Sequence, residues 1–131
     1  MIRATDTGIG LQVSFSNGRE YGLCDVTGDK GGGPGGFEPV ELLEASLASC
    51  IGMTVRFYAN RHDIPLERVT VQVSSDRSQP GEMVLHCTID LAGPLTDDHR
   101  KRLLRAAEAC PVQKALQKRI TITEAVVAGS Q

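Results

Sequence analysis

Four cysteines are the residues of this sequence with side chains suited to redox or nucleophilic chemistry: Cys24, Cys50, Cys87 and Cys110. They form no Cys-x-x-Cys pair, and the three histidines do not lie at the close spacing of zinc ligands. No Gly-x-Ser-x-Gly elbow of a serine hydrolase is present. The sequence therefore predicts thiol chemistry and calls for no metal or other cofactor.

Cys110 is followed directly by Pro111 in a stretch that otherwise has a helical pattern. Proline has no N–H to donate and costs about 3 kcal/mol in a helix interior, so we expect one helix to end at Cys110 and another to begin at Pro111. A thiol at the N-cap of the second helix meets free N–H groups and the positive end of the helix dipole, which lower its pKa. This argument predicts that Cys110 is the more acidic thiol. The alternative is a simple turn of the chain with a packed cysteine.

Cys50 lies in the middle of the longest helical segment, which spans about residues 38–62. Its helix positions predict that it faces a neighbouring helix, either as a core residue or as a partner for the sulfur of Cys110. Two thiols can form a disulfide only when their Cα atoms are about 4.4–6.8 Å apart. Cys87 has apolar neighbours on a predicted strand and is expected in the core, and Cys24 is expected to be structural.

The elements that must position these thiols follow from apolar periodicity and turn residues. Short strands are expected around residues 2–5 and 11–16, and an Asn17-Gly18 turn leads to a returning strand that includes Tyr21 and Leu23. A mobile glycine-rich loop, 27–36, precedes the long helix and lacks the order of a phosphate-binding loop. A hairpin of two strands within 66–93, a helix after Thr96, a second helix from Pro111 and a strand at 120–127 complete an α+β chain.

Composition limits the class of protein. The 131 residues carry a net charge of −2, contain no Trp and predict a single domain, 1–131, with an aliphatic core. Lys and Arg occur along the whole chain, without the clustered basic excess of a nucleic-acid-binding protein. No apolar run has the length of a membrane span, and the N-terminus lacks the order of a signal peptide, so a cytoplasmic, reducing location is expected. The long helix is apolar on almost every face, which predicts a second subunit.

The glycine-rich loop, the segment "PVELLEASLASC" and the segment "ACPVQKAL" occur in the order found in the OsmC/Ohr family, and the chain resembles its OsmC-like branch over nearly its whole length. The resemblance implies an intertwined homodimer with antiparallel sheets around two central helices. It also implies a thiol-dependent peroxidase for organic hydroperoxides. In that reaction Cys50 attacks the peroxide, Cys110 completes a disulfide, and a dithiol such as a lipoyl-bearing protein reduces it.

The family's peroxidases also use a Glu and an Arg near the reactive cysteine, and here Val40 occupies the position of that Glu. Glu41 is one residue later, about 900° of helical rotation before Cys50 and half a turn out of phase. It could serve a site across a dimer interface or simply stabilise the helix start. Arg19 is the candidate for the Arg, or else an exposed turn residue. Val40 favours an alternative function, a small-ligand-binding or redox-sensing protein with little turnover, and purely structural cysteines are a third reading.

Overall fold

The computed structural model describes residues 1–129 and forms two compact units. One contains Met1–Ser49 and Thr70–Asp90, and the other contains Cys50–Val69 and Leu91–Gln131. The boundary between them crosses the long helix and both strands of the second hairpin. The single domain expected from the sequence stays a prediction.

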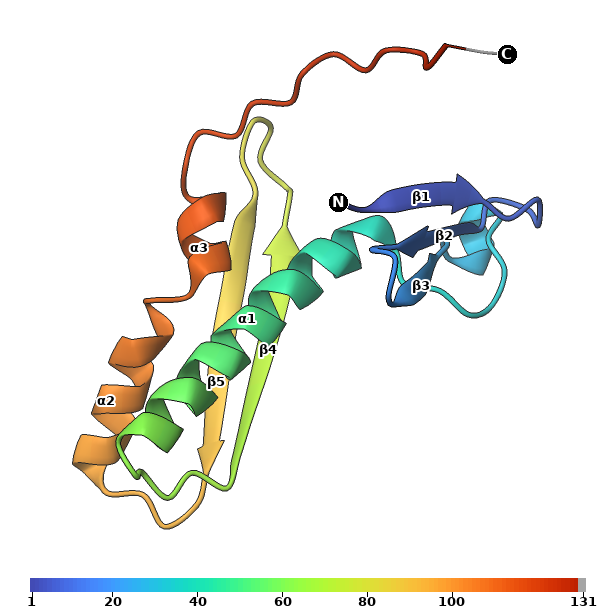
Figure 1. Ribbon diagram of the computed structural model, residues 1–131. Coiled ribbons are helices and arrows are strands. Elements are labelled where there is room, and N and C mark those ends of the chain that lie inside the picture. The colour runs from blue at the N-terminus through green and yellow to red at the C-terminus, as the bar shows by residue number, and fades with distance from the viewer. Residues whose placement is uncertain (130–131) are drawn as a thin grey trace. The chain divides into compact units, whose positions relative to one another are not determined.

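The first unit opens with a three-stranded antiparallel sheet made of β1 (Arg3–Asp6), β2 (Val13–Ser16) and β3 (Tyr21–Cys24), in the order β1-β2-β3 (Figure 1). All three strands were expected from the sequence. The turn between β2 and β3 differs from the tight two-residue turn that the Asn-Gly pair suggests, because only Gly18 has a positive φ. Instead, Asn17 Oδ1 accepts hydrogen bonds from the N–H groups of Arg19 and Glu20, at 2.8 and 2.9 Å, which stabilises a four-residue loop.

The glycine-rich loop is held in place by a buried carboxylate. Asp25 is only 7% exposed, and its two oxygens accept hydrogen bonds from the N–H groups of Val26, at 2.8 Å, and Gly33, at 3.2 Å. The short 3₁₀ helix η1 (Gly28–Lys30) lies between these contacts. A Cβ atom at Gly32 would overlap the Val26 carbonyl oxygen, so the close approach requires glycine. The loop that the sequence suggested to be mobile is therefore anchored.

The long helix α1 (Pro39–Arg61) begins at a proline, which suits the first helical position, and its predicted extent is confirmed. Just beyond its end, Asp63 adopts a positive φ of 51° and Pro65 prevents continuation. The hairpin of β4 (Arg68–Asp76) and β5 (Val84–Ala92) forms a separate two-stranded sheet.

The second unit contains most of the buried apolar side chains. One stripe of α1, with buried residues at every fourth position, supplies Ile51, Val55 and Ala59, which are at most 2% exposed. The helix α2 (Asp97–Ala107) adds Leu103 and Ala107. Thr96 starts α2 with a capping box, in which its hydroxyl accepts from the His99 N–H at 3.0 Å. The helix α3 (Pro111–Leu116) follows after the predicted break.

Two further expectations are wrong in this chain. Residues 119–129 form neither helix nor strand, and Ile120 and Ile122 are 61% and 90% exposed, whereas a strand was expected at 120–127. A β-strand needs a neighbouring strand for its backbone hydrogen bonds, and a sequence pattern cannot supply one. Cys87 is exposed on β5 and is not a core residue. Among the described residues, no helix is long and apolar enough to cross a membrane.

Leu103 and Leu104 offer a matched test of this core, because they are 0% and 50% exposed on the same helix. Leu103→Ala should lower the free energy of unfolding by about 2–5 kcal/mol, since it leaves a cavity. Leu104→Ala should change it by no more than about 0.5 kcal/mol, because its site can be filled by water. Urea denaturation followed by circular dichroism measures both. Equal losses would contradict the assignment of Leu103 to the core.

Candidate functional site: a thiol pair at a helix break

Cys110 lies at the break between α2 and α3. Its N–H donates to the Ala107 carbonyl at 3.2 Å, which ends the first helix, and its sulfur accepts from the Gln113 N–H at 3.5 Å as the N-cap of the second. The expected helix break and the capping position of Cys110 are therefore confirmed. The side chain is fully buried, with 0% of its surface exposed. Small reagents cannot reach this sulfur unless the surrounding structure opens.

Cys50 is half-buried on α1, and the fold brings its thiol to that of Cys110. The Cys110 side chain donates a hydrogen bond to the Cys50 sulfur, and the Val112 N–H in the first turn of α3 points to the same atom. Thr54, one turn further along α1, donates its hydroxyl to the Cys50 carbonyl at 2.7 Å and also interacts with the Cys50 side chain. Both cysteines are free thiols here.

The two thiols have opposite pKa shifts. The hydrogen bond from Cys110, followed by the one from Val112, lowers the pKa of Cys50. Burial, followed by the interaction with Cys50, raises the pKa of Cys110. The prediction that Cys110 is the more acidic thiol is therefore wrong. The amides at the start of α3 do stabilise a thiolate as expected, but burial outweighs them at Cys110, and the half-buried Cys50 receives the benefit.

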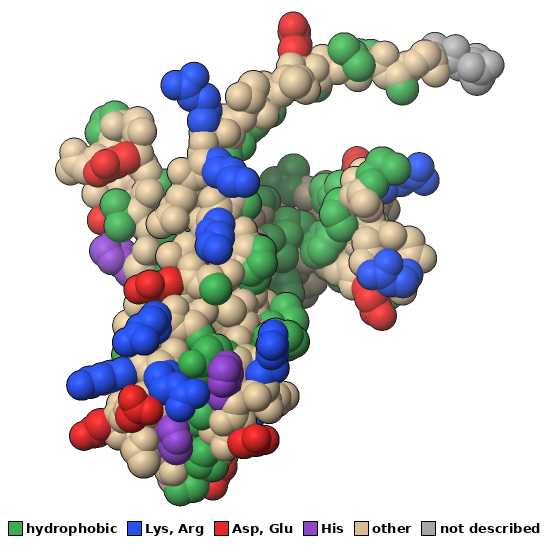
Figure 2. Space-filling view, turned by 60° about the vertical axis from the view of Figure 1, so that its left-hand side comes forward, with side chains coloured by type: hydrophobic (Ala, Val, Ile, Leu, Met, Phe, Trp, Pro, Cys, Tyr) green, Lys and Arg blue, Asp and Glu red, His purple; other side chains and the backbone are tan. Residues whose placement is uncertain are grey.

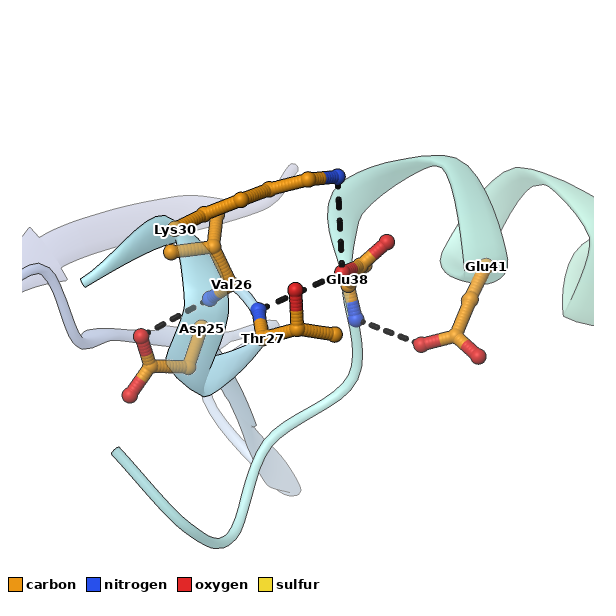
Figure 3. A network of polar contacts seen from close by, with 6 residues as sticks. All are labelled: Asp25, Val26, Thr27, Lys30, Glu38 and Glu41. Atoms are coloured by element: carbon orange, nitrogen blue, oxygen red, sulfur yellow. Dashed lines mark hydrogen bonds and ion pairs between the residues drawn. The ribbon is translucent and has the colours of Figure 1, made fainter. Parts of the chain in front are cut away.

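Glu41 has a structural contact at the start of α1. Its Oε1 accepts from the Glu38 N–H at 2.8 Å (Figure 3). The Glu38 carbonyl in turn accepts from the Leu42 N–H at 3.2 Å. The Glu38 carboxylate lies 3.9 Å from Lys30 Nζ and accepts from the Thr27 N–H, which ties the glycine-rich loop to the helix. These contacts support the interpretation of Glu41 as a residue that stabilises the helix start. A role for Glu41 in catalysis stays a prediction.

Arg19 lies in the exposed turn between β2 and β3, in the other unit from Cys50. Its backbone N–H is bound by Asn17, and its side chain forms no ion pair within residues 1–129. A catalytic role for Arg19 stays a prediction. In the same described part of the chain, no group of three or more His, Cys, Asp or Glu side chains could hold a metal ion.

Two contributors to the site were missed in the sequence. Thr54 is four residues after Cys50, a spacing that places both on one side of a helix. The Val112 N–H lies in the first turn of α3, where backbone N–H groups have no partner within the helix and can donate to a thiol. The position of Pro111 in the sequence already implied this free N–H. Which sulfur would receive that amide depends on tertiary packing.

The sequence profile of OsmC-like proteins matches residues 30–125, a range that contains both thiols and most of the glycine-rich loop. The chain belongs to the OsmC-like protein family. The resemblance seen in the two cysteine segments is therefore confirmed. No match was found among curated proteins.

Solved structures of OsmC-like proteins share this mixed α/β architecture. A putative osmotic stress induced and detoxification response protein from Psychrobacter arcticus is 26% identical, with a TM-score of 0.73 over 87% of this chain and 85% of that one. An OsmC-like protein from Mycoplasma pneumoniae is 19% identical, with a TM-score of 0.73 over 89% and 86%. An organic hydroperoxide resistance protein from Legionella pneumophila is 24% identical, with a TM-score of 0.63 over 89% and 88%. The last two likenesses establish the fold alone.

The opposite pKa shifts can be tested in a Cys24→Ser, Cys87→Ser background, where only the pair remains. We expect Cys50 to titrate below the usual thiol value of about 8.5 and Cys110 above it, as followed by thiolate absorbance for both thiols and by carboxymethylation for Cys50. Cys110→Ala should raise the pKa of Cys50, because it removes the hydrogen-bond donor. Cys110→Ser is the matched control, because its hydroxyl can still donate, and it should raise that pKa less. A Cys50 pKa that both variants leave unchanged would contradict the assignment.

Proposed function

We propose that this OsmC-like protein is a thiol-dependent peroxidase that reduces organic hydroperoxides through Cys50 and Cys110. The observation that supports the proposal most strongly is the placement of a half-buried thiol of lowered pKa against a second, fully buried thiol. Nucleophilic attack requires a thiolate, and the hydrogen bonds to Cys50 favour that form. The buried partner is protected from direct oxidation and is positioned to react next.

The proposed cycle has three steps. The Cys50 thiolate attacks one peroxide oxygen, the O–O bond breaks, and the other oxygen leaves and is protonated to the alcohol, so that Cys50 becomes a sulfenic acid. The sulfur of Cys110 then attacks the oxidised sulfur while its proton passes to the leaving hydroxyl, so that the S–O bond breaks, a disulfide forms and water is released. An external dithiol, such as that of a lipoyl-bearing protein, reduces the disulfide by exchange and is itself oxidised to a disulfide.

A homodimer is part of the proposal. On α1, Met53 is 67% exposed and Phe57 is 63% exposed, and both lie on the same stretch of helix as Cys50. Burial of large apolar side chains of this kind contributes about 1.5–3 kcal/mol each, so an uncovered apolar face favours association with a second copy. In the dimer, Arg19 and Glu41 would be the candidates for charged residues near the thiols.

A second candidate function is supported by a groove in the first unit. It has a volume of about 660 Å³, and its walls are mostly apolar side chains of the three-stranded sheet, such as Val13 and Phe15, and of the start of α1, such as Leu42. A groove of this size and character suits a small apolar ligand. Together with Val40 in the place of the family's Glu, it favours a ligand-binding or redox-sensing protein with little turnover.

The peroxidase cycle can be tested with cumene hydroperoxide and dihydrolipoamide. Cys50→Ser should reduce turnover to the background rate, because it removes the nucleophile. Cys110→Ser should allow a single turnover and leave a sulfenic acid at Cys50 that dimedone traps. Cys87→Ser is the matched control and should keep the wild-type rate, because it removes an exposed thiol outside the pair.

Undiminished dithiol-dependent turnover by Cys50→Ser would overturn the mechanism. Negligible turnover by the wild type, together with a rise in melting temperature on addition of an apolar ligand, would favour the second candidate. Val13→Glu, which places a charge in the groove wall, should then abolish that rise.

A further inference from the structure

Five basic side chains lie exposed along α2, α3 and the residues that follow, and form what we call the basic face. They are Lys101 and Arg105 on α2, Lys114 on α3, and Lys118 and Arg119 just after α3. Figure 2 shows Lys and Arg side chains following one another down this side of the molecule.

Positive charge is concentrated in one unit, and most of it lies in one stretch of the sequence, although Lys and Arg occur along the whole chain. The unit that contains the thiol pair has ten Lys and Arg against six Asp and Glu, while the other unit has four against ten. Within residues 99–119, seven basic residues accompany a single acidic one, Glu108. The net charge of −2 for the whole chain conceals this separation.

The fold accounts for only part of the basic face, because Arg105 and Lys114 lie in the last turns of α2 and α3, where a positive charge interacts favourably with the helix dipole. Lys101 and Arg105 are four residues apart on α2, and a like-charge pair at this spacing destabilises a helix by about 0.2–0.5 kcal/mol. By contrast, the neighbouring Arg102 is used in the structure: it lies 3.6 Å from Asp98 and donates to the Tyr58 hydroxyl at 3.2 Å. Among the described residues, none of the five side chains of the basic face forms an ion pair.

The basic face flanks Cys110 along the chain. Arg105 precedes Cys110 by five residues, and Lys114 follows it by four, so the helices that carry these charges meet at the cysteine. Cys110 is fully buried and Cys50 half-buried, so a molecule that reduces a disulfide between them must dock closely against this region.

We infer that the basic face docks an acidic protein that carries the reducing dithiol. The inference rests on the proposed function and adds the charge of the protein that reduces the disulfide. A negative surface around the partner's dithiol would be attracted to the basic face, which raises the rate of encounter and fixes its orientation. In the exchange, the two partner thiols lose two electrons and become a disulfide, and Cys50 and Cys110 become thiols.

The test uses the Cys24→Ser, Cys87→Ser protein, in which diamide oxidises Cys50 and Cys110 to a disulfide. The disulfide is therefore formed without any peroxidase turnover. Two synthetic peptides serve as probes: one has a Cys-x-x-Cys pair flanked by glutamates, and its control has glutamines in their place. We expect the acidic peptide to reduce the disulfide at least about tenfold faster at low salt, and the advantage to disappear near 0.5 M salt, where charges are screened.

Lys114→Gln with Lys118→Gln should remove most of this advantage and leave reduction by dithiothreitol unchanged. Arg3→Gln with Arg77→Gln, which removes two charges from the other unit and breaks no ion pair of the described residues, is the matched control and should keep the advantage. Equal rates for the two peptides, or an advantage unaffected by the Lys114 and Lys118 substitutions, would overturn the inference. Sedimentation supplies another outcome that would overturn it: if these substitutions dissociate an oligomer, the basic face is an interface with a second copy of the chain. Tighter binding of a DNA duplex than of the acidic peptide would also overturn it.

Failure of the proposed function gives a different result. If peptide mapping finds no Cys50–Cys110 disulfide after diamide or peroxide, the two-cysteine cycle is wrong. Binding of an acidic peptide with serines in place of its cysteines, measured by fluorescence anisotropy, then still reports on the basic face alone. Loss of that binding in the Lys114→Gln, Lys118→Gln protein supports the docking surface, and equal binding to the two proteins overturns it.

Discussion

The missing N–H of Pro111 is the constraint on which the thiol site depends. Because this residue cannot continue α2, the chain ends one helix at Cys110 and begins another immediately. The new helix presents free amides at its first turn, and its N-cap is a sulfur atom. The same break positions the Cys110 side chain against α1, where it meets Cys50. A single proline therefore fixes the position of the second thiol and of the amides that donate hydrogen bonds to the first.

This arrangement separates the two thiols by environment. Both sulfurs receive amide hydrogen bonds from α3, yet the pKa of Cys50 is lowered and that of Cys110 is raised. The difference arises because Cys110 is removed from water and donates its hydrogen bond, while Cys50 accepts one and remains partly accessible. The proposed two-step cycle needs one thiolate that reacts first and a second thiol that stays reduced until the first sulfur is oxidised, and these two environments suit those roles.

Local patterns in the sequence were sufficient for most elements. The proline at the start of α1, Thr96 before α2 and the alternation in β4 and β5 each specify structure through neighbours close in the chain, and these elements are confirmed. The segment 120–127 has a good strand pattern but lacks a neighbour to pair with in this chain, and the exposure of Cys87 likewise depends on what covers β5. The contact between Cys50 and Cys110 could be proposed from spacing and resemblance. Their relative acidity could not be predicted, because it depends on the burial of one side chain.

Met53 has a consequence for any cell or experiment in which this protein meets peroxide. It lies three residues after Cys50 on α1 and is 67% exposed in the single chain, so an oxidant that approaches the thiol of a protomer without its proposed partner also meets a thioether. A thioether carries no proton, so the formation of methionine sulfoxide does not depend on ionisation, whereas oxidation of Cys50 follows its thiolate fraction. The pH therefore sets how much oxidant reacts reversibly with Cys50 and how much converts Met53 to methionine sulfoxide, which only a sulfoxide reductase repairs. Acidification shifts that division towards Met53.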